Sequence, residues 1–178
     1  MALDLEEQEQ VDALKAWWKD HGNKVIVAVT VFVLAVAGWR GWEAYQSKQT
    51  GEAAALFDGL RKELATNDAK KIRDVAGQLI DKYPRTIYAT DAAMIAAKVN
   101  FESGDAKSAK AQYQWVIEHA KQAQSKDLAH LRLAVVLLDE KNYADALKQL
   151  EGAHDAAFAP LFNDLKGDVY SLQGKSKE

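Results

Sequence analysis

The side chains that could act as acids, bases or metal ligands are scattered along this chain and form no motif. Its four histidines are His21, His119, His130 and His154, and no two of them have the i, i+4 spacing that puts two metal ligands on one helix face. The chain has no cysteine, which excludes disulfides, thiolate nucleophiles and cysteine zinc sites. No glycine-rich phosphate loop follows a strand-like segment. We therefore predict that the protein is not an enzyme and that it has no cofactor and no metal site; an enzyme with an unrecognised site is the remotest alternative.

The elements that position these side chains read as helices. Alanine, leucine, lysine, glutamine and glutamate are abundant, the only prolines are Pro84 and Pro160, and no segment alternates with period two. Turn signals predict helices near residues 51–65, 68–82, 87–102, 105–123, 127–140, 143–154 and 161–173, with breaks that include Ser125 to Asp127. Short connections between such helices predict antiparallel pairs, and hence an all-α fold.

The helix pairs repeat along the chain. Gly104, Lys141 and Gly174 align as the turns within successive pairs, 37 and then 33 residues apart, close to the period of about 34 in tetratricopeptide repeats. Small residues stand seven positions before these turns and five after them: Ala97, Ala134 and Gly167, then Ala109 and Ala146. A tetratricopeptide-repeat-like α-solenoid is therefore predicted. Only residues 175–178 follow the last turn, where a second helix is expected, so we expect the natural chain to continue.

An uncharged run from Val25 to Trp39 indicates a membrane anchor. Fifteen residues reach about 22 Å, short of a hydrocarbon core of about 30 Å, but amphipathic rings and a basic residue flank the run. We expect the following side chains to lie at the membrane interfaces: Trp17, Trp18, Trp39, Arg40, Trp42 and Tyr45. The predicted organisation is a tail over 1–23, a transmembrane helix over 24–45 and a repeat domain over 46–178.

This run has two other interpretations. Ala35-Val36-Ala37 resembles a signal-peptidase site, but the leading segment is long and acidic, unlike a signal peptide. A buried core helix is disfavoured because the run has no polar face and the domain is small. Lys15, Lys19 and Lys24 precede the run whereas Arg40 and Lys48 follow it, which favours a cytoplasmic tail and a repeat domain on the other side.

The surface of the repeat domain suggests protein partners. Basic and acidic residues nearly balance over residues 50–178, which disfavours nucleic-acid binding. In such stacks the first helix of each pair lines the concave side. The expected partner-binding residues are Met94, Lys98, Phe101, Leu131, Val135, Leu138, Asp164 and Asp168. The helix near 127–140 is apolar nearly all round, so it is either buried by its neighbours or part of an apolar groove.

Nearly the whole chain resembles the YfgM family of ancillary subunits of the bacterial SecYEG translocon. The resemblance is carried by Trp17-Trp18-Lys19, Gly41-Trp42, Tyr83-Pro84-Arg85-Thr86-Ile87-Tyr88-Ala89, Leu131-Arg132-Leu133-Ala134 and Leu165-Lys166-Gly167-Asp168. It implies an inner-membrane protein with a periplasmic repeat domain, associated with SecYEG and with a PpiD-like membrane-anchored chaperone, and in contact with nascent secretory proteins. The alternative is a structural scaffold that organises envelope proteins without touching unfolded substrate. The resemblance also implies that relatives continue through a further helix or helices, so we expect this chain to end early within the family.

Overall fold

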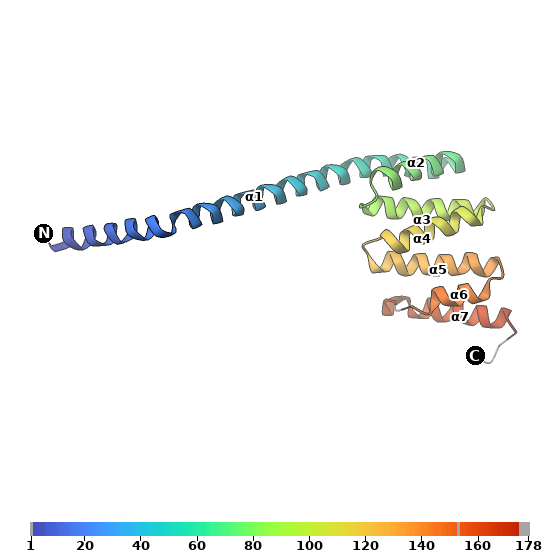
Figure 1. The fold of residues 1–178 in the computed structure, drawn as a ribbon. Helices are drawn as coiled ribbons and strands as arrows, with labels where there is room; N and C mark the ends of the chain where they lie inside the picture. Colours follow the sequence, from blue (N-terminus) through green and yellow to red (C-terminus); the bar gives the residue numbers. More distant parts are fainter. Residues whose placement is uncertain (1, 153, 175–178) are drawn as a thin grey trace. The chain divides into compact units, whose positions relative to one another are not determined.

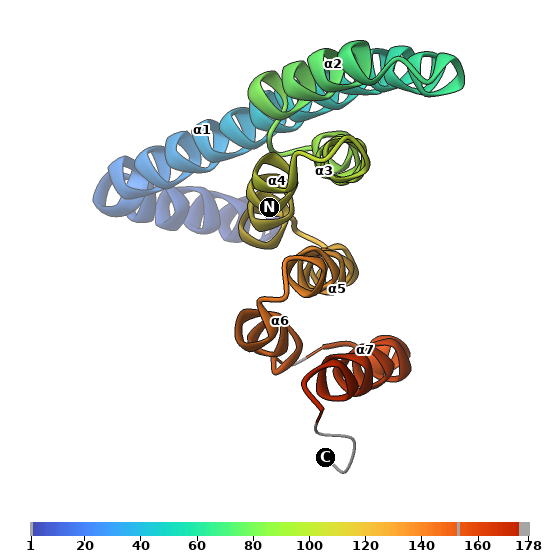
Figure 2. The same ribbon diagram turned by 90° about the vertical axis from the view of Figure 1, so that its right-hand side faces the viewer.

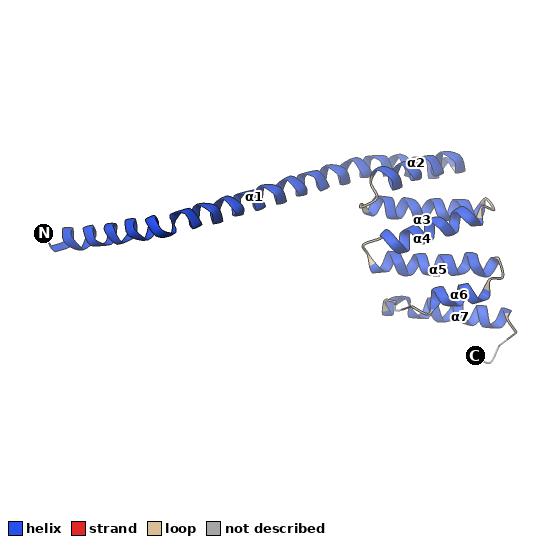
Figure 3. Ribbon diagram, viewed as in Figure 1, coloured by secondary structure: helices blue, strands red, loops and turns tan. Residues whose placement is uncertain are grey.

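The computed structural model describes residues 2–152 and 154–174, with side chains from residue 7 onward. Throughout these ranges every regular element is helical and no strand is present (Figure 3), which confirms the predicted all-α fold. The helices are α1 (Ala2–Thr66), α2 (Ala69–Lys82), α3 (Ile87–Glu102), α4 (Ala106–His119), α5 (Ala123–Asp139), α6 (Tyr143–Leu150), the 3-10 helix η1 (Ala156–Phe158) and α7 (Ala159–Leu172). The chain divides into two compact units, Met1–Lys48 and Gln49–Glu178, and the boundary falls within α1.

The first unit is a helical stretch whose described apolar side chains are almost all exposed. Those between Ile26 and Val36 are exposed, and within the described residues this is the one helix long and apolar enough to cross a membrane. Thr30 carries the only hydroxyl of the run, and its Oγ1 donates to the carbonyl oxygen of Ile26 at 2.8 Å. The segment therefore satisfies its polar groups internally, as a helix in lipid must.

The second unit is a stack of helix pairs (Figure 1). The end of α1 packs on α2, with Ala53 and Leu60 buried against Ile72, Ala76 and Leu79. The pairs α3–α4 and α5–α6 follow, and then α7. Figure 2 shows α3, α5 and α7 in one column with α4 and α6 in another. The first helices of successive pairs thus share one side of the stack.

The turns within the pairs are the ones that the repeat register predicts. Gly104, Lys141 and Gly174 all have a left-handed backbone, with φ of 83°, 59° and 74°. Asn67, at φ 56°, makes a fourth turn of the same kind, between α1 and α2, which the register did not include. The α1–α2 pair is therefore a further repeat unit.

A capping residue follows three of these turns. Asp68 accepts from the backbone N–H groups of Lys70 and Lys71, and Asp105 accepts from that of Ser108 at 3.0 Å. Asn142 plays the same part for α6. A hydrogen bond from Lys71 lowers the pKa of Asp68, and one from Ser108 lowers the pKa of Asp105. These two caps therefore stabilise the fold at pH values above the carboxyl pKa of the unfolded chain, and this stabilisation is lost as the pH falls through the lowered pKa.

Small residues allow the close approach of paired helices. Ala97, Ala109, Ala134 and Ala146 are fully buried, as expected from their places seven before and five after the turns. The equivalent Gly167 is exposed, and a Cβ added to it would meet nothing within 4 Å. The helix predicted to pack against it falls outside the described residues.

Some predicted helix boundaries are wrong. The helix expected at 51–65 is the end of α1, because no proline or turn signal interrupts the chain before Asn67. The break expected from Ser125 to Asp127 lies instead between His119 and Ala123. Asp127 does not cap its own helix: it is buried within α5, where its Oδ2 accepts the backbone N–H of Asp155 at 2.9 Å. The polar side chain of Asp127 thus serves a tertiary hydrogen bond and not a local turn.

Candidate functional site

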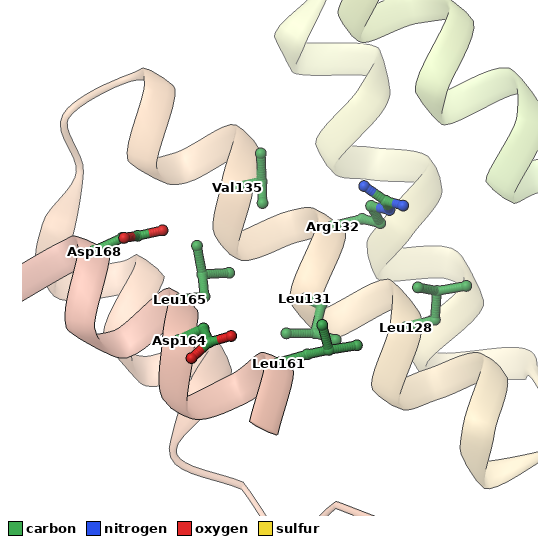
Figure 4. A pocket seen from close by; sticks show the side chains of 8 residues that line it. All are labelled: Leu128, Leu131, Arg132, Val135, Leu161, Asp164, Leu165 and Asp168. Atoms are coloured by element: carbon green, nitrogen blue, oxygen red, sulfur yellow. The ribbon is translucent and has the colours of Figure 1, made fainter. Parts of the chain in front are cut away.

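An open apolar depression of about 240 Å³ lies between α5 and α7 (Figure 4). Both helices contribute residues at spacings i, i+3, i+4 and i+7, which place each set on one helix face. Helix α5 provides Leu128, Leu131, Arg132 and Val135, and α7 provides Leu161, Asp164, Leu165 and Asp168. We call this depression the α5–α7 groove.

The groove has an apolar floor and an asymmetric charged rim. Leu131 is nearly buried, Val135 and Leu165 are half-buried, and Leu161 remains 53% exposed. On the α7 side Asp164 and Asp168 are both exposed. Apolar side chains in the groove can bind an apolar group, while the α7 rim favours a cation.

Arg132, the basic residue of the groove, is directed elsewhere. Figure 4 shows its guanidinium extending away from both aspartates. Burial raises the pKa of Tyr113 on α4, and the positive charge of Arg132 partly opposes that rise, so the guanidinium acts on the α4 side of α5. The two carboxylates therefore dominate the α7 side of the rim.

A second open cavity, of about 450 Å³, lies on the other side of α5. It is lined by Phe57, Arg61 and Leu64 of α1, Asp91, Met94 and Ile95 of α3, and Ser125 and Leu128 of α5. We call it the α1–α3–α5 cavity. Burial raises the pKa of Asp91 within it. Because Leu128 lines both depressions, they form one continuous surface over the first helices, here called the first-helix face.

The eight residues expected at a partner site separate into four sets. Leu131, Val135, Asp164 and Asp168 line the α5–α7 groove, and Met94 lines the α1–α3–α5 cavity. Lys98 is exposed on α3 and pairs with Glu102 of the same helix at 3.6 Å. Phe101 and Leu138 are half-buried and pack against the core, and they line neither depression.

The expected set omitted several lining residues. Leu161 and Leu165 share the face of Asp164 and Asp168, so the spacing on α7 was a usable signal for them. Phe57 and Arg61 carried no such signal, because the α1–α2 pair was not included in the repeat register. The two interpretations of the helix near 127–140 describe its two sides: Ala134 and Val136 are buried, while Leu128 and Val135 line the groove.

The six residues expected at membrane interfaces are all exposed on α1. From Trp18 to Trp39 an α-helix rises about 32 Å, close to the hydrocarbon thickness of about 30 Å. The rings of Trp42 and Tyr45 lie 6.2 Å apart at one end of this stretch. Their exposure and spacing fit two aromatic belts.

Possible metal ligands are not clustered. Over residues 7–152 and 154–174, no group of three or more His, Cys, Asp or Glu side chains is arranged to hold an ion.

Antiparallel helix pairs joined by left-handed turns at near-regular spacing define a tetratricopeptide-repeat-like protein. A family model described as "Tetratricopeptide repeat-like domain" matches residues 15–178. The chain is 37% identical to a protein named "Ancillary SecYEG translocon subunit" from Neisseria gonorrhoeae, over 100% of this chain and 86% of that relative. Proteins of the same name from Haemophilus influenzae and Escherichia coli are 28% and 25% identical, over 98% and 94% of this chain and 85% and 81% of the relatives. No solved structure matches.

The chain thus belongs to the tetratricopeptide repeat-like class and, within it, to the family of ancillary SecYEG translocon subunits. The resemblance drawn from sequence motifs is confirmed at this level.

Proposed function

We propose that this protein is a non-enzymatic accessory subunit of the SecYEG translocon in a bacterial inner membrane, and that its first-helix face binds partner polypeptides. Membership of a family whose relatives bear that name supports the first part. The observation that carries the second part is the α5–α7 groove, an apolar depression bounded by exposed carboxylates. Such a surface suits a polypeptide segment better than a small polar substrate.

The partners we propose are a PpiD-like membrane-anchored chaperone and emerging secretory polypeptides. Both would offer apolar segments outside the cytoplasm, near the membrane to which α1 attaches the repeat unit. Val135 is half-buried in the groove, so a partner can contact its side chain, and its replacement should leave the core intact.

Photocrosslinking from the groove tests this function. A photoreactive amino acid at Val135 should trap the chaperone or nascent secretory chains, whereas one at Ala111, exposed on the second helix α4, should not. Trapping of folded envelope proteins alone from Val135 would favour the scaffold alternative. Equal yields from the two positions would contradict a partner site in the groove.

The topology we propose has residues 1–23 in the cytoplasm, a span over 24–45 and residues 46–178 in the periplasm. The excess of lysines before the span supports this orientation, since basic residues near a span favour the cytoplasmic side. The repeat unit would then lie on the same side of the membrane as the periplasmic chaperone and as translocon components exposed there.

Cysteine labelling measures the orientation directly, because the chain contains no cysteine of its own. In intact spheroplasts, Ala111→Cys should react with a membrane-impermeant maleimide while Ala13→Cys reacts only after lysis. Both positions are exposed, so accessibility within the protein does not separate them. Labelling of Ala13→Cys before lysis, with protection of Ala111→Cys, would reverse the proposed orientation.

A further inference from the structure

The carboxylates of the α5–α7 groove are available for a cation from outside the chain. Asp164 and Asp168 are one helical turn apart, so they share a face of α7, and both are exposed. In the part of the chain that the structure describes, no ion pair or hydrogen bond engages either carboxylate, and the guanidinium of Arg132 extends away from them (Figure 4). The α7 rim thus has two unneutralised negative charges beside an apolar floor.

The size of the groove suits apolar side chains. It holds about 240 Å³ and is open to solvent, so an occupant can insert side chains while its backbone lies along the rim.

A neighbouring cavity can take a second side chain of the same segment. The two depressions lie on either side of α5 and share Leu128. Packed helices are about 8–10 Å apart, a distance that a short peptide segment spans.

We propose that the first-helix face selects a basic and apolar polypeptide segment. One bulky apolar side chain enters the α5–α7 groove, a Lys or Arg beside it pairs with Asp164 and Asp168, and a second apolar side chain of the same segment enters the α1–α3–α5 cavity. This inference rests on the proposed function of that face, and it adds the charge of the segment that binds.

The charge selection is measurable with short peptides and the full-length protein in neutral detergent micelles. Three fluorescent decapeptides carry the same leucines and differ only in flanking Lys, Gln or Glu. We expect the lysine peptide to bind about three- to twentyfold more tightly than the glutamine peptide in 50 mM salt, and the glutamate peptide to bind most weakly. The difference should shrink in 500 mM salt, because exposed charges are screened.

Substitutions then locate the selecting charges. The double variant Asp164→Asn, Asp168→Asn should bind all three peptides alike, because it keeps the shape of the rim and removes its charge. Asp74→Asn, at an exposed position of the second helix α2, is the control and should keep the wild-type order. A double variant that still prefers the lysine peptide would overturn the assignment to these two carboxylates.

A second pair of variants separates the charge preference from binding itself. Leu161→Ser removes an exposed apolar side chain of the groove and should raise the dissociation constants of all three peptides about fivefold. Leu172→Ser, similarly exposed on α7 but outside the groove, should not. If the peptides bind with equal affinity whatever their charge, yet Leu161→Ser weakens them, the inference fails and the proposed function stands. If no peptide binds, peptide recognition by this face and the inference both fail.

Discussion

Replacement of Phe162 by alanine is expected to lower the free energy of unfolding of the last helix by about 3–5 kcal/mol, the usual cost of truncating a buried phenylalanine. Phe162 is only 2% exposed and belongs to the same buried cluster as Leu150 of α6 and residues of α5. Its ring also stacks on that of His154, with centroids 4.1 Å apart. No other side chain of α7 contributes as much buried volume to this contact.

The loss of stability in the Phe162→Ala protein should be confined to the last helix. In a stack of repeats each pair contacts only its neighbours, so α7 can detach while the earlier pairs stay folded. Hydrogen exchange should accelerate about a hundredfold or more for α7 amides and little for α3 amides. Because α7 forms one side of the α5–α7 groove, peptide binding to this groove should fall with it.

Phe158→Ala is the matched control. Phe158 is half-buried at the edge of the same cluster, so its truncation should cost much less. Equal acceleration of exchange in α3 and α7 of the Phe162→Ala protein would show that the unit unfolds as a whole. Local detachment of the last helix would then be the wrong description.

Local signals in the sequence were enough to predict the repeat turns. A left-handed turn favours glycine or asparagine, and an Asp or Asn cap often follows it, so Gly104-Asp105 and Asn67-Asp68 are recognisable without neighbours. Lys141 itself has no such preference, but the cap Asn142 follows it, and its spacing of 37 residues from Gly104 places the turn in the repeat register. Periodicity thus supplements residue type.

Tertiary partners were beyond the reach of the same reasoning. Asp127 looks like a turn residue until Asp155, 28 positions later, is seen to donate its backbone N–H to it. Phe101 and Leu138 look like groove residues because a helix period alone cannot tell the core side from the open side of a helix that is apolar nearly all round. Which faces stay open depends on how neighbouring helices pack.

Replacement of Phe32 by arginine is expected to prevent stable membrane attachment. Phe32 is midway between Lys24 and Arg40, and its side chain is 69% exposed, so no part of the protein would shield the new charge. An arginine at the centre of a span raises the apparent free energy of insertion by about 3 kcal/mol. The uncharged run is only fifteen residues long, so it has little apolar excess to offset that cost. The fraction of protein that remains with membranes after alkaline extraction should fall sharply.

Two substitutions at similar depth distinguish charge from shape. Phe32→Leu keeps an apolar side chain, and Thr30→Val removes the one hydroxyl of the run, whose hydrogen bond to Ile26 is already satisfied within the helix. Both proteins should stay in the membrane fraction. An arginine at the bilayer centre requires a compensating partner, and α1 contains none between Val25 and Trp39. If the full-length Phe32→Arg protein also resists extraction, its membrane attachment must therefore depend on something other than this helix.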